Sequence, residues 1–124
     1  MTVVNLDQAP VFTSDGFTFR PLAVPSRGST DLAIWRVDAA PAAISVEHSM
    51  SREEVFISHT IGLHVTMAGE EYRLAPGDAL TVPPNTRLVI TNPSPDTIAT
   101  FTAVTSVGML GTIGDNTFAP PWAQ

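Results

Sequence analysis

Chemistry in this sequence must rest on histidine and carboxylate side chains, because the chain has no cysteine and its six basic residues are all arginine. Thiol nucleophiles, disulfides, iron–sulfur clusters and Schiff bases are therefore excluded. Of the three histidines, His48 is followed six residues later by Glu54. A histidine and a carboxyl group in one nonpolar site can serve as general base and general acid. We therefore take His48 and Glu54 as the candidate catalytic pair.

The alternation of residue types around His48 predicts which way its side chain points. Side chains two residues apart on a strand share a face. His48 should therefore share one side with Ile44, Val46 and Met50. If the strands form a barrel and that nonpolar side faces its interior, the side chain of His48 lies inside the barrel.

Glu54 is placed with Phe56 by the same rule. An unpaired carboxylate on an inner face is costly, so Glu54 should pair with His48, be protonated or lie near water. Burial would raise its pKa and suit it to acid–base work. The alternative is that Glu54 is a solvated residue before the strand, as we expect for Glu53.

From residue 47 to residue 92 the sequence resembles the cupin superfamily. The second cupin motif has the form G(X)5PXG(X)2H(X)3N, and residues 77–92 follow this spacing without a gap. Gly77, Pro83 and Asn92 match, whereas Asn85 stands in place of a glycine and Leu88 in place of the histidine. Asparagine tolerates a left-handed backbone, so the turn at Asn85 should survive. The change at Leu88 removes a metal ligand.

The first cupin motif, G(X)5HXH(X)3,4E(X)6G, fits less closely. One register places His48 at the first histidine, Met50 at the second and Glu54 at the acid. A rival register places Val46 and His48 at the two histidines and Glu53 at the acid. We prefer the first, because Glu54 then begins the usual acid-plus-apolar strand. Either register leaves two ligands at most.

The resemblance implies an all-β, cupin-type antiparallel double-stranded β-helix, or jelly-roll barrel, with a degenerate metal site. A typical cupin metal needs about three histidines and one carboxylate, and thioether sulfur is a poor donor to iron, manganese or zinc. We therefore expect no metal and no other cofactor. The site becomes a nonpolar pocket for a small organic molecule, and its expected substrate-binding residues are Met50, Phe56, Leu88 and Ile90.

Short segments rich in Val, Ile, Thr and Phe predict strands throughout one domain of residues 1–124. Eleven prolines and eight glycines leave little room for a long helix. The expected strands are residues 17–24, 32–37, 43–49, 55–60, 63–67, 72–74, 79–82, 87–91 and 97–105. Residues 108–114 are interpreted as turns. The tail from residue 118 to residue 124 should be irregular, with Phe118 and Trp122 capping the barrel or meeting a second subunit.

Twelve acidic and six basic residues give a net charge of −6. This charge disfavours nucleic acid and anionic membranes as partners, because both attract clustered positive charge. The chain shows no secretion signal or run of transmembrane length, so we expect a cytoplasmic protein. The resemblance to small cupins, which often form homodimers through their N-terminal strands, implies a homodimer, and the apolar start at Val3 and Val4 and the proline-rich tail fit this expectation.

Three classes of function remain open. The first is a metal-independent isomerase, lyase or cyclase that uses His48 and Glu54. The second is a non-catalytic ligand-binding or sensor module with the same pocket. The third is a metal-dependent oxygenase or isomerase in which His64, water or substrate completes the ligand shell of a divalent metal. His59 should point outward. We favour the enzyme without metal, because a carboxyl group is costly to keep in a nonpolar pocket without a task.

Overall fold

The computed structural model describes all residues from Met1 to Gln124 and consists of short strands with three single-turn 3-10 helices. The strands are β1 (Phe12–Ser14), β2 (Phe17–Pro21), β3 (Leu32–Ala39), β4 (Ser49–Met50), β5 (Glu54–Ser58), β6 (Leu63–Met67), β7 (Glu70–Leu74), β8 (Ala79–Val82), β9 (Leu88–Thr91), β10 (Ala99–Ser106), β11 (Gly111–Ile113) and β12 (Asn116–Phe118). The 3-10 helices are η1 (Leu6–Gln8), η2 (Pro25–Arg27) and η3 (Pro121–Ala123). None of them has the length and nonpolar character needed to span a membrane.

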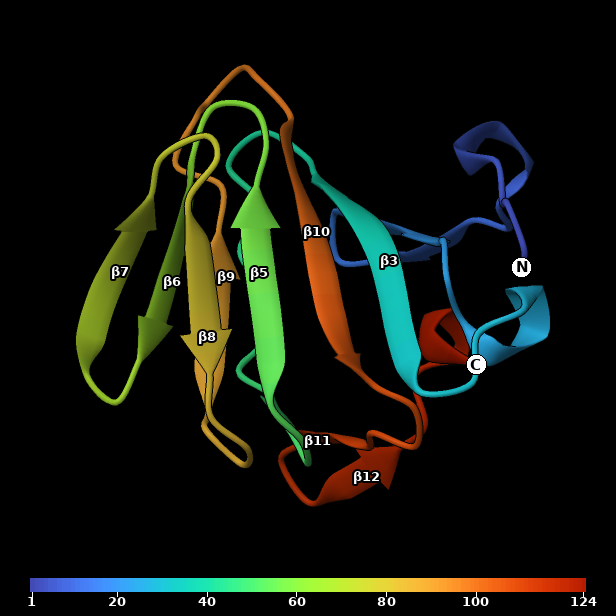
Figure 1. The fold of residues 1–124 in the computed structure, drawn as a ribbon. Helices are drawn as coiled ribbons and strands as arrows, with labels where there is room; N and C mark the ends of the chain where they lie inside the picture. The colour runs from blue at the N-terminus through green and yellow to red at the C-terminus, as the bar shows by residue number, and fades with distance from the viewer.

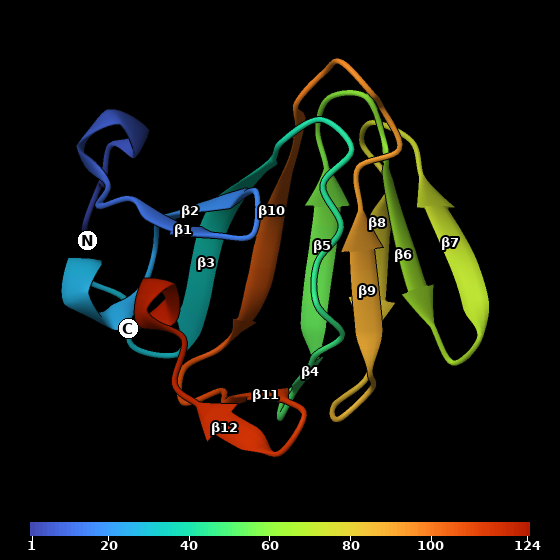
Figure 2. The ribbon, with the colours of Figure 1, turned by 180° about the vertical axis from the view of Figure 1, so that it is seen from behind.

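The strands form three antiparallel sheets. The largest has the order β1-β2-β3-β10-β5-β8, and the smaller ones have the orders β7-β6-β9 and β12-β11-β4. In Figure 1, β8 lies in front of β9, and in the reverse view of Figure 2 it lies behind, so two layers face each other. The hairpin of β11 and β12 lies across one end of these layers (Figure 1). The predicted all-β jelly-roll architecture is confirmed.

The central strand β10 organises the larger sheet. It pairs with β3 from Ala99↔Ala39 to Ser106↔Leu32 and with β5 from Phe101↔Ser58 to Thr105↔Glu54. Buried and half-buried residues alternate along β10, so one face of the sheet enters the core. On that face the rings of Phe56 and Phe101 meet edge to face, with centroids 5.5 Å apart.

The strand predicted at residues 43–49 is interrupted by a bulge. Ile44 forms a β-bridge with Thr91, and His48 forms one with Leu88. Between these two bridges the chain advances four residues on the segment with His48 but only three residues on β9, so this segment contains one extra residue. An extra residue of this kind transfers the following side chains to the other face. Ile44 is therefore exposed, which corrects the prediction that it shares the interior side with His48.

Three strands escaped prediction from the sequence. Gly111–Ile113 is a strand within the residues interpreted as turns, and Asn116–Phe118 extends into the tail expected to be irregular. The third, Phe12–Ser14, pairs with β2 through a tight turn at Asp15 and Gly16. Both turn residues have positive φ, 49° and 86°, as the tightest hairpin turns require. The Asp-Gly pair was the available signal for this hairpin.

Asn92, which matches the asparagine of the second cupin motif, joins separate parts of the chain. It is 1% exposed, and its Nδ2 donates hydrogen bonds to the carbonyl oxygens of Ala39, Ala40 and Thr97. Its Oδ1 accepts a hydrogen bond from the backbone N–H of Ser94. Every hydrogen-bonding group of this amide is therefore satisfied by backbone. The left-handed turn expected at Asn85 is also present, with φ of 59°.

Replacing Asn92 by alanine is expected to lower the free energy of unfolding by about 3 kcal/mol, because several buried backbone groups lose their partners. Urea denaturation followed by circular dichroism measures the change. Asn116→Ala is the matched control, since Asn116 is exposed and its side chain makes no hydrogen bond. Equal stability of the two variants would contradict the structural role of Asn92.

Candidate ligand-binding cavity

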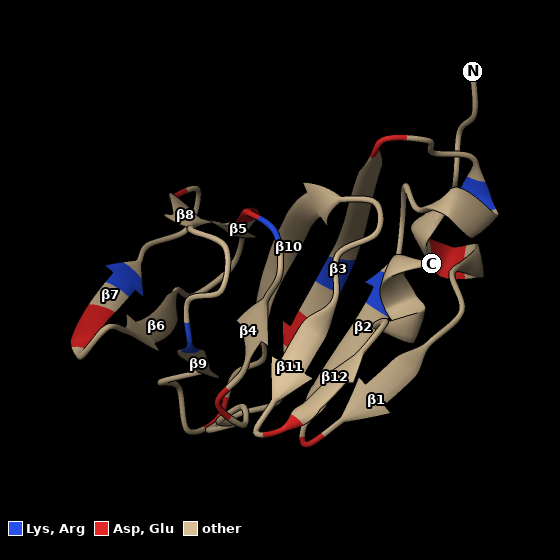
Figure 3. Ribbon diagram, turned by 90° about the horizontal axis from the view of Figure 1, so that it is seen from below, with Lys and Arg blue, Asp and Glu red and all other residues tan.

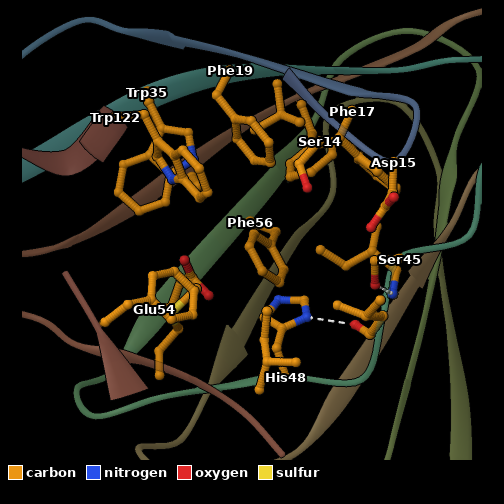
Figure 4. A pocket seen from close by; sticks show the side chains of 18 residues that line it. Ser14, Asp15, Phe17, Phe19, Trp35, Ser45, His48, Glu54, Phe56 and Trp122 are labelled. Carbon is orange, nitrogen blue, oxygen red and sulfur yellow. Dashed lines mark hydrogen bonds between the residues drawn. The ribbon is translucent and has the colours of Figure 1, made fainter. Parts of the chain in front are cut away.

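A cavity of about 90 Å³ lies between the larger sheet, the bulged segment and the β11–β12 hairpin. Eighteen residues line it, and 13 of them are hydrophobic. Figure 4 shows the side chains around this common space. The lining includes both tryptophans and five of the six phenylalanines of the chain: Phe17, Phe19, Trp35, Phe56, Phe101, Phe118 and Trp122. Such a lining is typical of a site for a small, largely nonpolar molecule.

The room in the cavity depends on a small residue of β10. Ala103 lies opposite Trp35 of β3 on one side and opposite Phe56 of β5 on the other. All three residues line the cavity. Because a methyl group fills much less space than a ring, Ala103 leaves a gap between its two large neighbours.

Glu54, the first residue of β5, brings a carboxyl group into this nonpolar space. Its side chain is 1% exposed, lines the cavity and makes no hydrogen bond, and Oε1 is fully buried. Burial raises the pKa of Glu54 to about 8, because the ionised form would lose its hydration. At neutral pH the group is therefore a protonated acid that can donate a hydrogen bond. The alternative of a solvated Glu54 is excluded, whereas Glu53 is exposed.

His48 follows the bulge and presents its ring to the same cavity. Its Nδ1 lies 2.8 Å from the carbonyl oxygen of Val46. A carbonyl oxygen only accepts, so Nδ1 carries the proton and Nε2 of the neutral ring is left as an acceptor. Loss of hydration lowers the pKa of His48, and the hydrogen bond to Val46 opposes this only in part. The ring is therefore neutral at pH 7.

His48 and Glu54 lie in one cavity but not in contact. No hydrogen bond or ion pair joins them, and Figure 4 shows their side chains entering the space from different segments. The pairing of Glu54 with His48 that the sequence allowed is therefore absent. Protonation of the carboxyl group, the second of the predicted possibilities, is the one that the raised pKa supports. The two side chains thus leave one donor and one acceptor free in the same cavity.

The C-terminal tail closes part of the cavity. The rings of Phe19 and Trp122 stack with centroids 3.9 Å apart and planes 8° from parallel. Phe118 of β12 also lines the space, and its ring lies over Gly111, where an added Cβ would come within 2.9 Å of it. The capping role predicted for the tail aromatics is therefore what the structure shows. Exposed residues at the mouth include Ser14, Asp15 and Ile113.

Three of the four predicted pocket residues lie where the sequence indicated. Met50, Phe56 and Ile90 line the cavity. Leu88 does not, which corrects its assignment as a substrate-binding residue. It points into the core on β9, is 1% exposed, and its backbone exchanges two hydrogen bonds with that of His48. Its contribution is to hold His48 in place.

The donor set does not fit the metal that cupins typically hold. No group of three or more histidine, cysteine, aspartate or glutamate side chains is placed to bind a metal ion. His64 cannot complete such a set, because its Nδ1 lies 3.4 Å from the carboxylate of Glu71 and its side chain does not line the cavity. His59 points outward as predicted, with Nε2 2.6 Å from Oγ1 of Thr102. Two candidate donors, His48 and Glu54, are fewer than the usual set.

Comparison with known proteins finds likeness to solved structures. No protein-family model matches the chain, and no curated protein matches it. The polyketide cyclase RemF from Streptomyces resistomycificus superposes with a TM-score of 0.77 at 13% identity, over 97% of this chain and 85% of that one. KdgF from Halomonas sp. superposes with a TM-score of 0.70 at 21% identity, over 86% of this chain and 92% of that one.

An RmlC-like cupin from Shewanella frigidimarina NCIMB 400 gives a TM-score of 0.70 at 18% identity, over 84% of this chain and 88% of that one. At such low identities the likeness concerns the fold alone. It shows that the chain is a small protein of the cupin fold, as the resemblance of residues 47–92 implied.

The buried acid makes stability depend on pH in an unusual direction. In the unfolded chain Glu54 ionises near pH 4.5, whereas in the folded chain it keeps its proton up to about pH 8. Between these values the folded state holds the extra proton, so this residue lowers the free energy of unfolding by about 1.4 kcal/mol per pH unit as pH rises. The loss is complete above pH 8 and absent below pH 4.5.

Glu54→Gln is therefore expected to gain about 4 kcal/mol relative to the unmodified protein between pH 5 and pH 8. Urea denaturation of both proteins at several pH values gives this difference directly. The exposed neighbour provides the matched variant, Glu53→Gln, whose difference should not change in this way. A flat difference for Glu54→Gln would show that Glu54 is already ionised in the folded protein.

Proposed function

We propose that the protein is a metal-independent isomerase, lyase or cyclase that acts on a small organic molecule in the cavity. The observation that carries the proposal is the free hydrogen-bonding capacity of a buried group, Glu54, and a half-buried group, His48, in one nonpolar space. Glu54 is a protonated acid without a partner, and His48 is a neutral base whose Nε2 has no partner. An unpaired carboxyl group is costly to bury, so a task for it is the expected reason for its presence.

These protonation states suit proton transfer next to a carbonyl group. Nε2 of His48 would take a proton from the carbon beside the carbonyl, while Glu54 would donate its proton to the carbonyl oxygen as an enol forms. The enol then reacts by returning the proton at another carbon, by expelling a leaving group or by closing a ring. Each route leaves the protein with the same number of protons after one cycle. The nonpolar walls keep the local dielectric low, which strengthens the interactions of His48 and Glu54 with the bound molecule.

Two features of the comparisons and the donor set support this class. RemF, which is described as a polyketide cyclase, matches over nearly the whole chain, and ring closure is among the reactions that an acid–base pair can promote. No three histidine, cysteine, aspartate or glutamate side chains are placed so that they could hold one metal ion. Fold likeness alone does not assign an activity, so the argument rests on His48 and Glu54.

A non-catalytic binding or sensor module is the second candidate. The separation of His48 from Glu54 favours it, because a linked acid and base would be the stronger sign of catalysis. Such a module would bind ligands in the same cavity without any proton transfer to carbon.

Hydrogen–deuterium exchange at carbon tests the enzyme directly without knowledge of the natural substrate. 2-Indanone, a small aromatic ketone, is incubated with the protein in deuterium oxide at neutral pH, and NMR measures the loss of the protons beside the carbonyl. We expect exchange above the buffer rate. Glu54→Gln and His48→Gln should each lower the protein-dependent rate by about 100-fold, the scale of general acid–base catalysis.

Glu53→Gln and His59→Gln are the matched controls, because both residues are exposed and outside the cavity. These two variants should exchange at the unmodified rate, and treatment with EDTA should leave the rate unchanged. Binding of the ketone without exchange would favour the binding module. Loss of exchange after EDTA treatment would instead support a metal-dependent enzyme.

A further inference from the structure

The lining of the cavity also limits the kind of molecule that can enter it. This inference rests on the proposed use of the cavity as the ligand site and deepens it. We infer that the cavity binds neutral, flat aromatic compounds that carry a hydroxyl group, such as phenols and enols, and rejects carboxylates. The charge, the hydrogen-bonding groups and the shape of the cavity each favour this class of ligand.

The first property is charge. The ionisable residues that line the cavity are Asp15, His48 and Glu54, and no arginine is among them. Asp15 is exposed at the mouth. In Figure 3 the strands β1, β11 and β12 carry no basic residue, and the blue segments lie on β2, β3, β7, the helix η2 and two loops. A carboxylate entering this space would lose its hydration without gaining a cation, which is strongly unfavourable.

The second property is hydrogen bonding. Glu54 offers a donor, because its carboxyl group is protonated, and His48 offers an acceptor at Nε2. A hydroxyl group can accept from the first and donate to the second. An ether or a ketone can only accept, and would leave Nε2 of His48 without a partner. Leaving a buried polar group unpaired weakens binding about tenfold or more.

The third property is shape. Ala103 leaves space between Trp35 and Phe56, so a bound molecule would lie beside ring faces and edges. On another side of the cavity, Phe19 and Trp122 present a stacked pair. Aromatic rings gain from stacked or edge-to-face contact beyond the area that they bury. A flat ring therefore fits these walls better than a puckered ring of the same size.

Four compounds of similar size separate these properties: phenol, anisole, benzoate and cyclohexanol. Their affinities at pH 7 are measured by calorimetry, and the indole N–H signals of Trp35 and Trp122 in NMR show whether the cavity is occupied. Both tryptophans of the chain line the cavity, so both signals should move. We expect phenol to bind most tightly, with anisole about tenfold weaker, cyclohexanol several-fold weaker and benzoate at least 100-fold weaker.

Two variants of one residue refine the test. Glu54→Gln keeps a hydrogen-bond donor in the cavity, so phenol affinity should remain within about threefold. Glu54→Leu removes the donor at this position. Phenol affinity should then fall about tenfold, and anisole affinity should fall by about tenfold at most. Glu54→Gln thus retains ligand binding although it loses proton exchange, which separates the ligand class from the catalytic proposal.

The outcomes are distinct for the two proposals. Benzoate that binds as tightly as phenol, equal affinities for anisole and phenol, or no binding of any compound would overturn the ligand class. Selective phenol binding without exchange of 2-indanone would uphold the ligand class and overturn the enzyme. Exchange of 2-indanone without selectivity for phenol would uphold the enzyme and overturn the ligand class.

Discussion

The pairing of β10 with both β3 and β5 is the constraint on which the rest of the structure depends. These two ladders bring the buried faces of three strands into one surface, with Trp35, Phe56 and Phe101 on it. Within that surface Ala103 lies between two large rings, and the missing volume becomes part of the cavity. The same pairing places Glu54 beside Thr105 at the edge of this space. Position in the ladder, more than any local preference, therefore decides the environment of the acid.

The buried acid connects stability to function. A carboxyl group with no partner works against folding above its ordinary pKa, and a nonpolar residue of similar shape would pack without that penalty. The protein keeps a donor at this place by raising the pKa of Glu54 to about 8. His48 complements it with the opposite state, because the hydrogen bond to Val46 leaves Nε2 free as an acceptor. At neutral pH the cavity thus contains a donor at Glu54 and an acceptor at Nε2 of His48.

Two residues near His48 stand where the cupin motifs place histidines, and the structure shows where each of them lies. Where the cupin motifs place a histidine, Leu88 fills the core and its backbone holds His48. Met50 takes the place of another ligand and lines the cavity with its nonpolar side chain. Neither leucine nor methionine side chains are the donors that the typical cupin metals prefer.

From the sequence alone, most strand positions and the shared face of His48 and Met50 could be predicted, because alternation along a strand is a local pattern. The jelly-roll class followed from the resemblance of residues 47–92 to the cupin motifs, with Gly77, Pro83 and Asn92 at the expected spacing. The burial of Glu54 was one of two possibilities that the sequence left open, and the structure settles it. Only the packed structure could show that His48 and Glu54 are not joined and that Leu88 lies outside the cavity, and it selected the capping position of Phe118 and Trp122 from the two that the sequence left open. The physical reason is that a one-residue bulge exchanges the two faces of a segment, and its position depends on pairing with β9. Contacts between residues 19 and 122 likewise depend on how distant segments pack, which no local pattern records.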